Sequence, residues 1–212
     1  MSNNLVFSII FKQIPKLLSV ILHPLIMPTL GIYILLSSAG TNAYMLDLQD
    51  KNFIITLVAA FTFVIPLAFV PFYYYFKISS TFTMNQRQDR IIPLIVTSIV
   101  FYICFMLFRV KGAPHLIQAF LFATTLSVFF NLLITIRWQI SAHMIGIGGI
   151  IGLVFTLAFL YHIDTMGYLM LAILLAGLAG FARLSLNVHT PKQVYLGFLL
   201  GFSTTLLTIF LY

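Results

Sequence analysis

Three short polar stretches interrupt an otherwise apolar chain, and each carries side chains that can do chemistry. They are NQRQDRIIP at 85–93, SAH at 141–143 and RLSLNVHTPKQ at 183–193. Arginine forks match the oxygens of a phosphate group, and histidine can attack phosphorus or protonate a leaving oxygen. Together the stretches contain two histidines, three arginines and two serines, and two histidines with two or three of the arginines and a serine are a sensible composition for a phosphate site.

The acidic side chains are few, and this excludes several kinds of active site. The sequence has four carboxylates, Asp47, Asp50, Asp89 and Asp164, and no glutamate. A two-metal centre, the carboxylate pair of a glycoside hydrolase and an aspartate-rich Mg²⁺ site each need a cluster that these spacings do not supply. The single cysteine, Cys104, excludes an internal disulfide and a cysteine-rich metal site. Any chemistry must therefore be carried by histidine, arginine, lysine and hydroxyl groups.

The elements that position these stretches must lie in a membrane. Of the 212 residues, 61% are hydrophobic and only 7% are charged, which leaves too little polar surface for a water-soluble domain of this size. We therefore predict an integral, multi-pass protein of the plasma (inner) membrane. Its net charge of +7 is spread over the loops without a basic run, which favours lipid headgroups or phosphate as partners and not nucleic acid.

Seven apolar stretches of roughly 18 to 24 residues are each long enough to cross a bilayer once. We place them near 17–37, 53–76, 91–110, 115–136, 141–161, 166–183 and 191–211. This predicts an all-α, polytopic helical bundle of about seven (six or seven) transmembrane segments, in a single membrane domain over residues 1–212. Residues 1–16 are expected to form an amphipathic interfacial segment, and His23 beside Pro24 predicts a kink in the first span.

Seven crossings determine which loops share a membrane face. The N-terminus and the loops 77–90, 137–140 and 184–190 fall on one face. That face carries eight Lys and Arg residues against three on the other, which favours a cytoplasmic location for it. If the three arginines of the polar stretches serve a ligand, only five against three remain. Among the five histidines, only His143 and His189 begin helices on this face.

Small residues in the last three spans predict close helix packing. Gly148 and Gly152 are four apart in the fifth span, Gly197 and Gly201 are four apart in the seventh, and AGLAG occupies 176–180 in the sixth. Such spacing lets helix backbones approach closely in lipid. We expect these three spans to form a compact bundle that holds the flanking loops in register.

The order and spacing of these residues resemble the type 2 phosphatidic acid phosphatase superfamily. That family is marked by three motifs: Lys-x6-Arg-Pro, Pro-Ser-Gly-His and Ser-Arg-x5-His-x3-Asp. ISAH resembles the second motif through Ser141 and His143, while Arg183 and His189 have the spacing of the third. The resemblance covers about 85–200, which would form a phosphatase-like core.

The resemblance implies a role for each residue. His189 would be the nucleophile that forms a phosphohistidine, and His143 would be the acid that protonates the leaving alkoxide. The phosphoryl oxygens would be held by Arg183, Arg90 and Arg87, with Ser141 and the Ala142 amide. No metal and no cofactor is implied. The expected function is hydrolysis of a lipid phosphate or diphosphate, such as phosphatidic acid, phosphatidylglycerophosphate, a polyprenyl diphosphate or a phosphorylated glycolipid.

The sequence departs from the family pattern at several positions. Arg90 precedes Pro93 by three residues instead of one, and Arg87 would have to fill the role of the lysine. The leading serine of the third motif is Ala182, and its aspartate falls at Gln193. A glutamine can accept an N–H bond and orient His189, but it supplies no negative charge.

Two functions besides hydrolysis are compatible with the same residues. One is binding of a lipid phosphate by a homologue that does not hydrolyse it. The second is that of a small transporter or flippase, which predicts a discontinuous span and a polar site in mid-membrane. Helix capping also accounts for TPKQ, with Thr190 as N-cap, Pro191 first and Gln193 third, and for Ser141 as N-cap of the fifth span.

Overall fold

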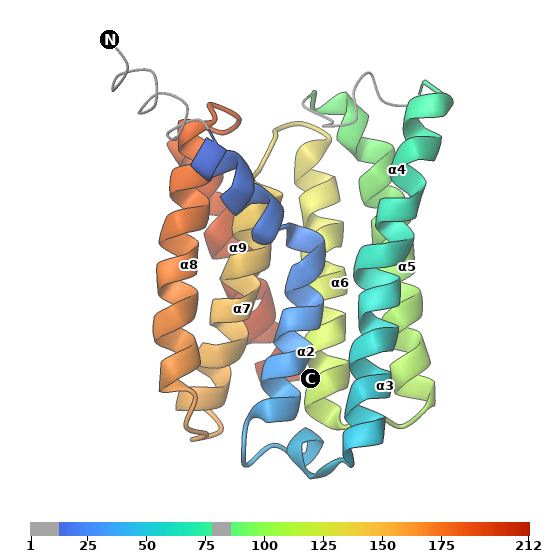
Figure 1. The fold of residues 1–212 in the computed structure, drawn as a ribbon, viewed down its shortest axis with the longest axis vertical. Coiled ribbons are helices and arrows are strands. Elements are labelled where there is room, and N and C mark those ends of the chain that lie inside the picture. The colour runs from blue at the N-terminus through green and yellow to red at the C-terminus, as the bar shows by residue number, and fades with distance from the viewer. Residues whose placement is uncertain (1–12, 78–85) are drawn as a thin grey trace.

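The computed structural model describes residues 13–77 and 86–212, and it confirms an all-α membrane bundle. The residues described include seven apolar helices that are long enough to span a bilayer, arranged side by side (Figure 1). Their bounds are Gln13–Ser37, Leu48–Tyr75, Gln88–Val110, His115–Thr135, Ala142–Phe159, Met166–Ser185 and Pro191–Leu211. Most of the predicted amphipathic segment at 1–16 lies outside the described residues.

The first span is interrupted near its beginning. Helical residues 13–21 run obliquely across the upper end of the bundle, and the chain then turns into η1 (Pro24–Ile26) and α2 (Met27–Ser37) (Figure 1). His23 has an extended backbone, with φ −64° and ψ 134°, because the residue before a proline is disfavoured in helical geometry. The predicted kink at His23 and Pro24 is therefore confirmed.

The next three spans complete one side of the bundle. The second comprises α3 (Leu48–Ala59), the π-helical turn η3 (Ala60–Val64) and α4 (Ile65–Tyr75). The third begins with η4 (Gln88–Arg90) and continues as α5 (Ile91–Val110), and the fourth is α6 (His115–Thr135). A π-turn and in-helix prolines break the regular hydrogen-bond ladder of the second span.

The last three spans are α7 (Ala142–Phe159), α8 (Met166–Ser185) and α9 (Pro191–Leu211). α7 is the most buried of the seven spans. It packs along α9 through glycines: a Cβ at Gly152 would lie 2.7 Å from the Phe202 carbonyl oxygen, and one at Gly197 would lie 2.8 Å from the Ser141 carbonyl oxygen. The predicted close packing is thus confirmed for α7 and α9, and α8 packs mainly on α7.

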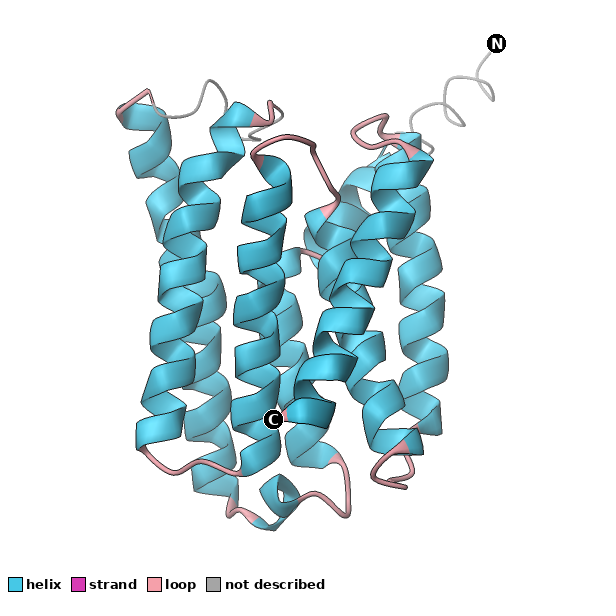
Figure 2. Cartoon of the chain, turned by 180° about the vertical axis from the view of Figure 1, so that it is seen from behind, coloured by secondary structure: helices cyan, strands magenta, loops and turns pink. Residues whose placement is uncertain are grey.

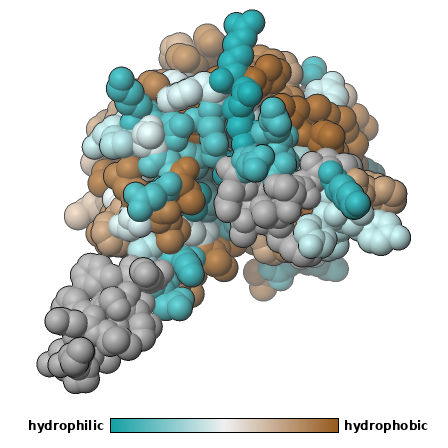
Figure 3. Space-filling model, turned by 90° about the horizontal axis from the view of Figure 1, so that it is seen from above, coloured by the Kyte–Doolittle hydropathy of each residue, from teal (hydrophilic) through white to brown (hydrophobic). Residues whose placement is uncertain are grey.

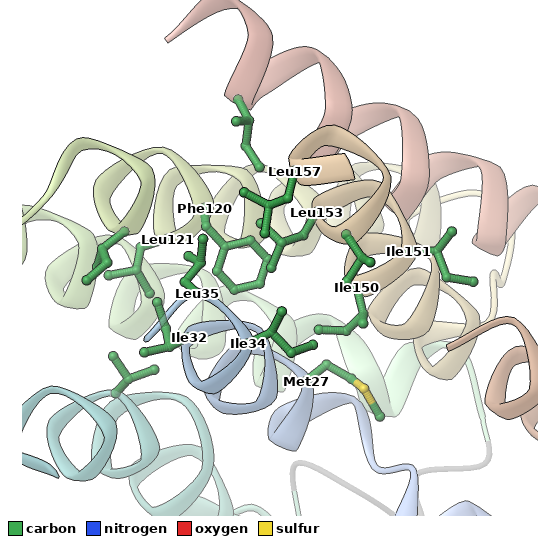
Figure 4. Close-up of a cluster of buried hydrophobic side chains, with 14 of the residues drawn as sticks. Met27, Ile32, Ile34, Leu35, Phe120, Leu121, Ile150, Ile151, Leu153 and Leu157 are labelled. Carbon is green, nitrogen blue, oxygen red and sulfur yellow. The ribbon is translucent and has the colours of Figure 1, made fainter. Parts of the chain in front are cut away.

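The centre of the bundle is a hydrophobic cluster contributed by α2, α6 and α7. Leu35, Phe120, Leu153 and Leu157 converge there from the three helices (Figure 4). Each of these side chains is at most 1% exposed. Burial at this density resists relative movement of the helices, so α7 is held between α2, α6 and α9.

Loops gather at the two ends of the bundle, as the seven crossings predict. The loops at 136–141 and 186–190 lie at one end, which also carries residues 13–21 (Figures 1 and 2). The loops at 38–47 and 160–165 lie at the other end with the C-terminus (Figure 2). The polar stretches around residues 90, 143 and 189 therefore share one face.

Candidate phosphate site

The site is built where α7 and α9 begin. Because α8 returns the chain across the membrane, α7 and α9 run parallel and their N-termini lie side by side. The Ser141 backbone N–H donates to the Gln193 carbonyl oxygen at 3.3 Å, joining the SAH stretch to the TPKQ stretch. The first N–H groups of each helix have no intrahelical partner, and two such ends together favour an anion.

His189 is held by the first turn of α9. Its Nδ1 lies 3.1 Å from Gln193 Oε1, and the same oxygen accepts the Thr190 backbone N–H at 3.0 Å. Since an amide oxygen only accepts, Nδ1 carries the ring hydrogen and Nε2 keeps its lone pair. The capping box of Thr190 and Gln193 is present as predicted, and the side chain of Gln193 also fixes the imidazole.

The environment of His189 keeps its imidazole neutral. Its pKa is lowered to about 4, chiefly by burial and also by the positive charges of Arg183 and Arg90, while the hydrogen bond to Gln193 acts in the opposite direction. A buried histidine between two guanidiniums is costly to protonate. His189 therefore presents an unprotonated Nε2 at neutral pH.

His143, in the first turn of α7, is contacted from the first span. Its Nε2 lies 3.0 Å from the Ser19 carbonyl oxygen, so Nε2 donates and carries the hydrogen. The His23 ring meets the His143 ring edge to face, with centroids 5.8 Å apart. Arg183 and His189 also lie close enough to interact with His143 electrostatically.

Arg183, in the last turn of α8, contacts the same residue of the first span, Ser19. Its Nη1 donates to Ser19 Oγ at 3.2 Å. Arg183 Nε and Ser141 Oγ are buried without a hydrogen-bond partner among the described residues. Ser141 occupies the N-cap position of α7, but its side chain makes no capping bond, so capping does not account for this hydroxyl. Unsatisfied buried polar atoms are costly, and a phosphate oxygen would satisfy both.

Arg90 and Arg87 have different surroundings. Arg90 lies near Arg183 and His189, and with the Gln139 amide oxygen turned toward it, that oxygen accepts from Nη2 at 3.1 Å and Nη1 at 3.2 Å. Arg87 Nη1 instead donates to the Ile136 carbonyl oxygen and, at 3.5 Å, to that of Thr135. Its guanidinium therefore binds carbonyl groups at the C-terminal end of α6, and the structure does not place it beside His189.

Most of the residues expected from the sequence thus meet on one face. The structure gathers His189, His143, Arg183, Arg90, Ser141, Ala142 and Gln193 there. Seen from this end, hydrophilic side chains cluster over the middle of the molecule (Figure 3). Sequence reasoning missed Ser19, which contacts both His143 and Arg183; a serine in the first span gave no signal of this by its spacing.

The chain matches no protein-family model, no curated protein and no solved structure. The chemistry open to the site therefore follows from its own geometry. A neutral imidazole, a second imidazole, two guanidiniums and two helix N-termini lie near one another at the same end of the bundle. Such a set complements a phosphoryl group during transfer, because it combines a nucleophile with fixed positive charge.

Proposed function

We propose that the protein is a membrane lipid phosphatase of the type 2 phosphatidic acid phosphatase kind, acting in the plasma membrane through a phosphohistidine. The observation that carries this proposal is the Nδ1 contact of His189 with Gln193, which leaves Nε2 with its lone pair, in a residue close enough to Arg183 and Arg90 to interact with both electrostatically. An imidazole held in this tautomer is oriented for attack on phosphorus.

The reaction then proceeds in two transfers. His189 Nε2 attacks phosphorus, the phosphorus–oxygen bond to the lipid breaks, and the leaving oxygen takes a proton from His143. Water next attacks the phosphohistidine, gives its proton to His143, and breaks the phosphorus–nitrogen bond, which returns neutral His189 and inorganic phosphate. His143 takes up this proton on Nδ1 beside the bound phosphate. Its Nε2–H continues to donate to the Ser19 carbonyl oxygen, and its Nδ1–H is the proton given to the leaving oxygen.

The charge that develops on the phosphoryl oxygens is matched by fixed donors. Arg183 and Arg90 supply guanidinium charge near His189. Ser141 Oγ and Arg183 Nε have no partner among the described residues, and the Ala142 N–H belongs to the first turn of α7. Donors already in place at the site lower the cost of reorganisation during the reaction.

A second candidate function is binding of a lipid phosphate without turnover. Two observations favour it: Gln193 is neutral where the family has a carboxylate, and Ser19 already accepts hydrogen bonds from His143 and Arg183. A transporter receives less support, because the arginine and histidine side chains that can bind an anion lie together at one end of the bundle and not in mid-membrane.

The deciding experiment measures phosphate release by purified protein in lipid nanodiscs, with chelator present. Substrates are phosphatidic acid, phosphatidylglycerophosphate, a polyprenyl diphosphate and a phosphorylated glycolipid. We expect His189→Ala to lower release by about a thousandfold or more. His115→Ala, an exposed histidine on the opposite face, is the matched control and should leave it unchanged.

Each outcome distinguishes the candidates. Acid-labile phosphate bound covalently to the wild type and absent from His189→Ala would support the phosphohistidine. Normal turnover by His189→Ala would refute the mechanism. A folded wild type that binds these lipids but releases no phosphate would favour the binding function.

A further inference from the structure

An apolar cavity lies directly beneath the candidate phosphate site. It lies between η1, α2, α5, α6, α7 and α9 and comprises about 660 Å³ of atom-free space, part of which is open to the surroundings of the protein. Ala142, whose amide belongs to the phosphate site, lines it, and Phe101, Phe120 and Ile150 line it deeper in the bundle. The cavity therefore adjoins the phosphate site at Ala142.

Polar side chains of α6 interrupt this apolar wall, and Ser127 is the first of two that matter. It is 6% exposed, and its Oγ has no hydrogen-bond partner among the described residues. Its neighbours Thr124 and Thr125 each donate to the Leu121 carbonyl oxygen of their own helix, the usual solution for a hydroxyl in an apolar helix. Ser127 does not adopt that solution although it lines the cavity.

Asn131 lies one turn further along the same wall and is 5% exposed. Its Oδ1 accepts from Thr135 Oγ1 at 3.2 Å, so its amide N–H groups are the donors that it can offer to a ligand in the cavity. An unpaired donor inside a bilayer costs several kcal/mol by general estimates. The unpaired hydroxyl of Ser127, with the Asn131 amide beside it on the same cavity wall, therefore calls for a ligand that carries an acceptor at their level.

The depth of Ser127 and Asn131 in the bundle restricts the kinds of ligand that can place an acceptor beside them. At 1.5 Å rise per residue, Asn131 lies about 6 Å and Ser127 about 12 Å below Thr135, the polar end of α6. In a glycerolipid the ester carbonyls follow the phosphate after only a short glycerol unit. A polyprenyl chain carries no acceptor beyond its phosphate oxygens, and it would leave both donors unpaired.

We propose that Ser127 and Asn131 recognise the ester carbonyl of an acyl lipid whose phosphate occupies the site and whose chain fills the cavity. This inference rests on the phosphate site proposed above and deepens it by selecting ester-linked glycerolipids over polyprenyl and ether-linked ones. The hydroxyl of Ser127 and the amide of Asn131 donate to the carbonyl, and the surrounding wall takes the acyl chain.

The test compares lipids that differ only at the carbonyl. Binding of dioleoylglycerol phosphate, its dialkyl ether analogue and undecaprenyl phosphate to the purified protein is measured by native mass spectrometry. The wild type should prefer the ester over the ether about tenfold, the worth of one or two buried hydrogen bonds. Ser127→Ala and Asn131→Leu should reduce that preference to about twofold or less, and Ser203→Ala, an exposed serine on α9, should retain it.

The wild-type comparison stands even if Asn131→Leu fails to fold. Equal binding of ester and ether by the wild type, or tighter binding of undecaprenyl phosphate, would overturn the proposal. Competition with diacylglycerol and dialkylglycerol, which lack phosphate, examines the cavity alone. If the protein prefers the ester lipid in this competition but releases no phosphate, only the hydrolytic function is refuted. If it releases phosphate but shows no preference for the ester, only the carbonyl recognition is refuted.

Discussion

At the scale of single residues, Gln193 caps a helix and orients a histidine with the same oxygen atom. One oxygen, Oε1, accepts from both the Thr190 backbone N–H and His189 Nδ1. The same contact that closes the first turn of α9 thus sets the imidazole tautomer. What a glutamine does not provide is negative charge to stabilise a positively charged imidazole during transfer.

Gln193→Glu restores that charge without changing the reach of the side chain. A glutamate at the third helical position still completes the capping box, so the fold should be retained. We expect phosphate release to rise by at least about tenfold, because a carboxylate partner commonly contributes orders of magnitude at such sites. Steady-state kinetics would check this, with Gln193→Leu as the comparison that loses both the cap and the orientation. A folded Glu variant with the wild-type rate would contradict the assigned role of Gln193.

The protonation of His189 gives a second prediction at this scale. Burial lowers its pKa to about 4 from an ordinary value of 6.5. The sign follows directly: the ring stays neutral as the pH falls through 6.5, and it gains a proton, losing its nucleophilic lone pair, only near pH 4. Nuclear magnetic resonance of ¹⁵N-histidine-labelled protein should show this midpoint for the resonance that disappears in His189→Asn. A midpoint near 6.5 would contradict the buried, arginine-flanked environment, and Gln193→Glu should move the midpoint upward.

At the scale of elements, the α7 and α9 contact places the two histidines side by side. Gly201 lies against the Ile145 carbonyl and Gly148 against the Phe198 carbonyl, in both cases too close for a side chain. Small residues at these positions let the helices approach until Ser141 N–H reaches the Gln193 carbonyl oxygen. The glycines therefore act on the site through the relative position of two helix N-termini.

Gly201→Ala tests this contact with a single added methyl group. The new Cβ meets backbone atoms of α7 that cannot rotate away, so we expect a loss of stability of about 1 to 3 kcal/mol or more. Thermal unfolding in detergent provides the measurement. Gly177→Ala on α8 is the matched control, because a Cβ there meets nothing within 4 Å. Equal melting temperatures for the two variants would show that the contact is not tight.

At the scale of the whole molecule, the bundle separates two chemically different ends. The site, its arginines and residues 13–21 lie at one end, while His115, His162 and the C-terminus lie at the other. The charge distribution favours a cytoplasmic location for the end that carries the site. Because each span crosses the bilayer, the two ends of the bundle face different compartments.

Cysteine accessibility tests this arrangement in cells. Cys104 is fully buried, so an introduced cysteine can be labelled against a silent background. Ser185→Cys at the site end and Lys111→Cys at the other end are both exposed positions. A membrane-impermeant thiol reagent should label one of them in intact cells and the other only after permeabilisation. Labelling of both from outside would contradict seven crossings, and the position labelled from outside identifies the membrane face of the site.

The sequence by itself determined the features that depend on local composition and spacing. These are the number of spans, the loops that share a face, the capping box at Thr190 and the glycine spacing of α7 and α9. The bilayer imposes the length of each span, and helix geometry imposes the capping and glycine patterns. Both constraints act over a few turns, so they can be read from the residues in order.

Only the tertiary structure decided which distant groups meet. Ser19 reaches His143 and Arg183 across separations of 124 and 164 residues, because the kink at His23 lays residues 13–21 over the site. Arg87 is taken up by carbonyls of α6, and Ser127 faces the cavity beneath Ala142. Such contacts depend on how each helix is rotated and tilted against its neighbours, which is set by side-chain packing over the whole bundle and not by spacing along the chain.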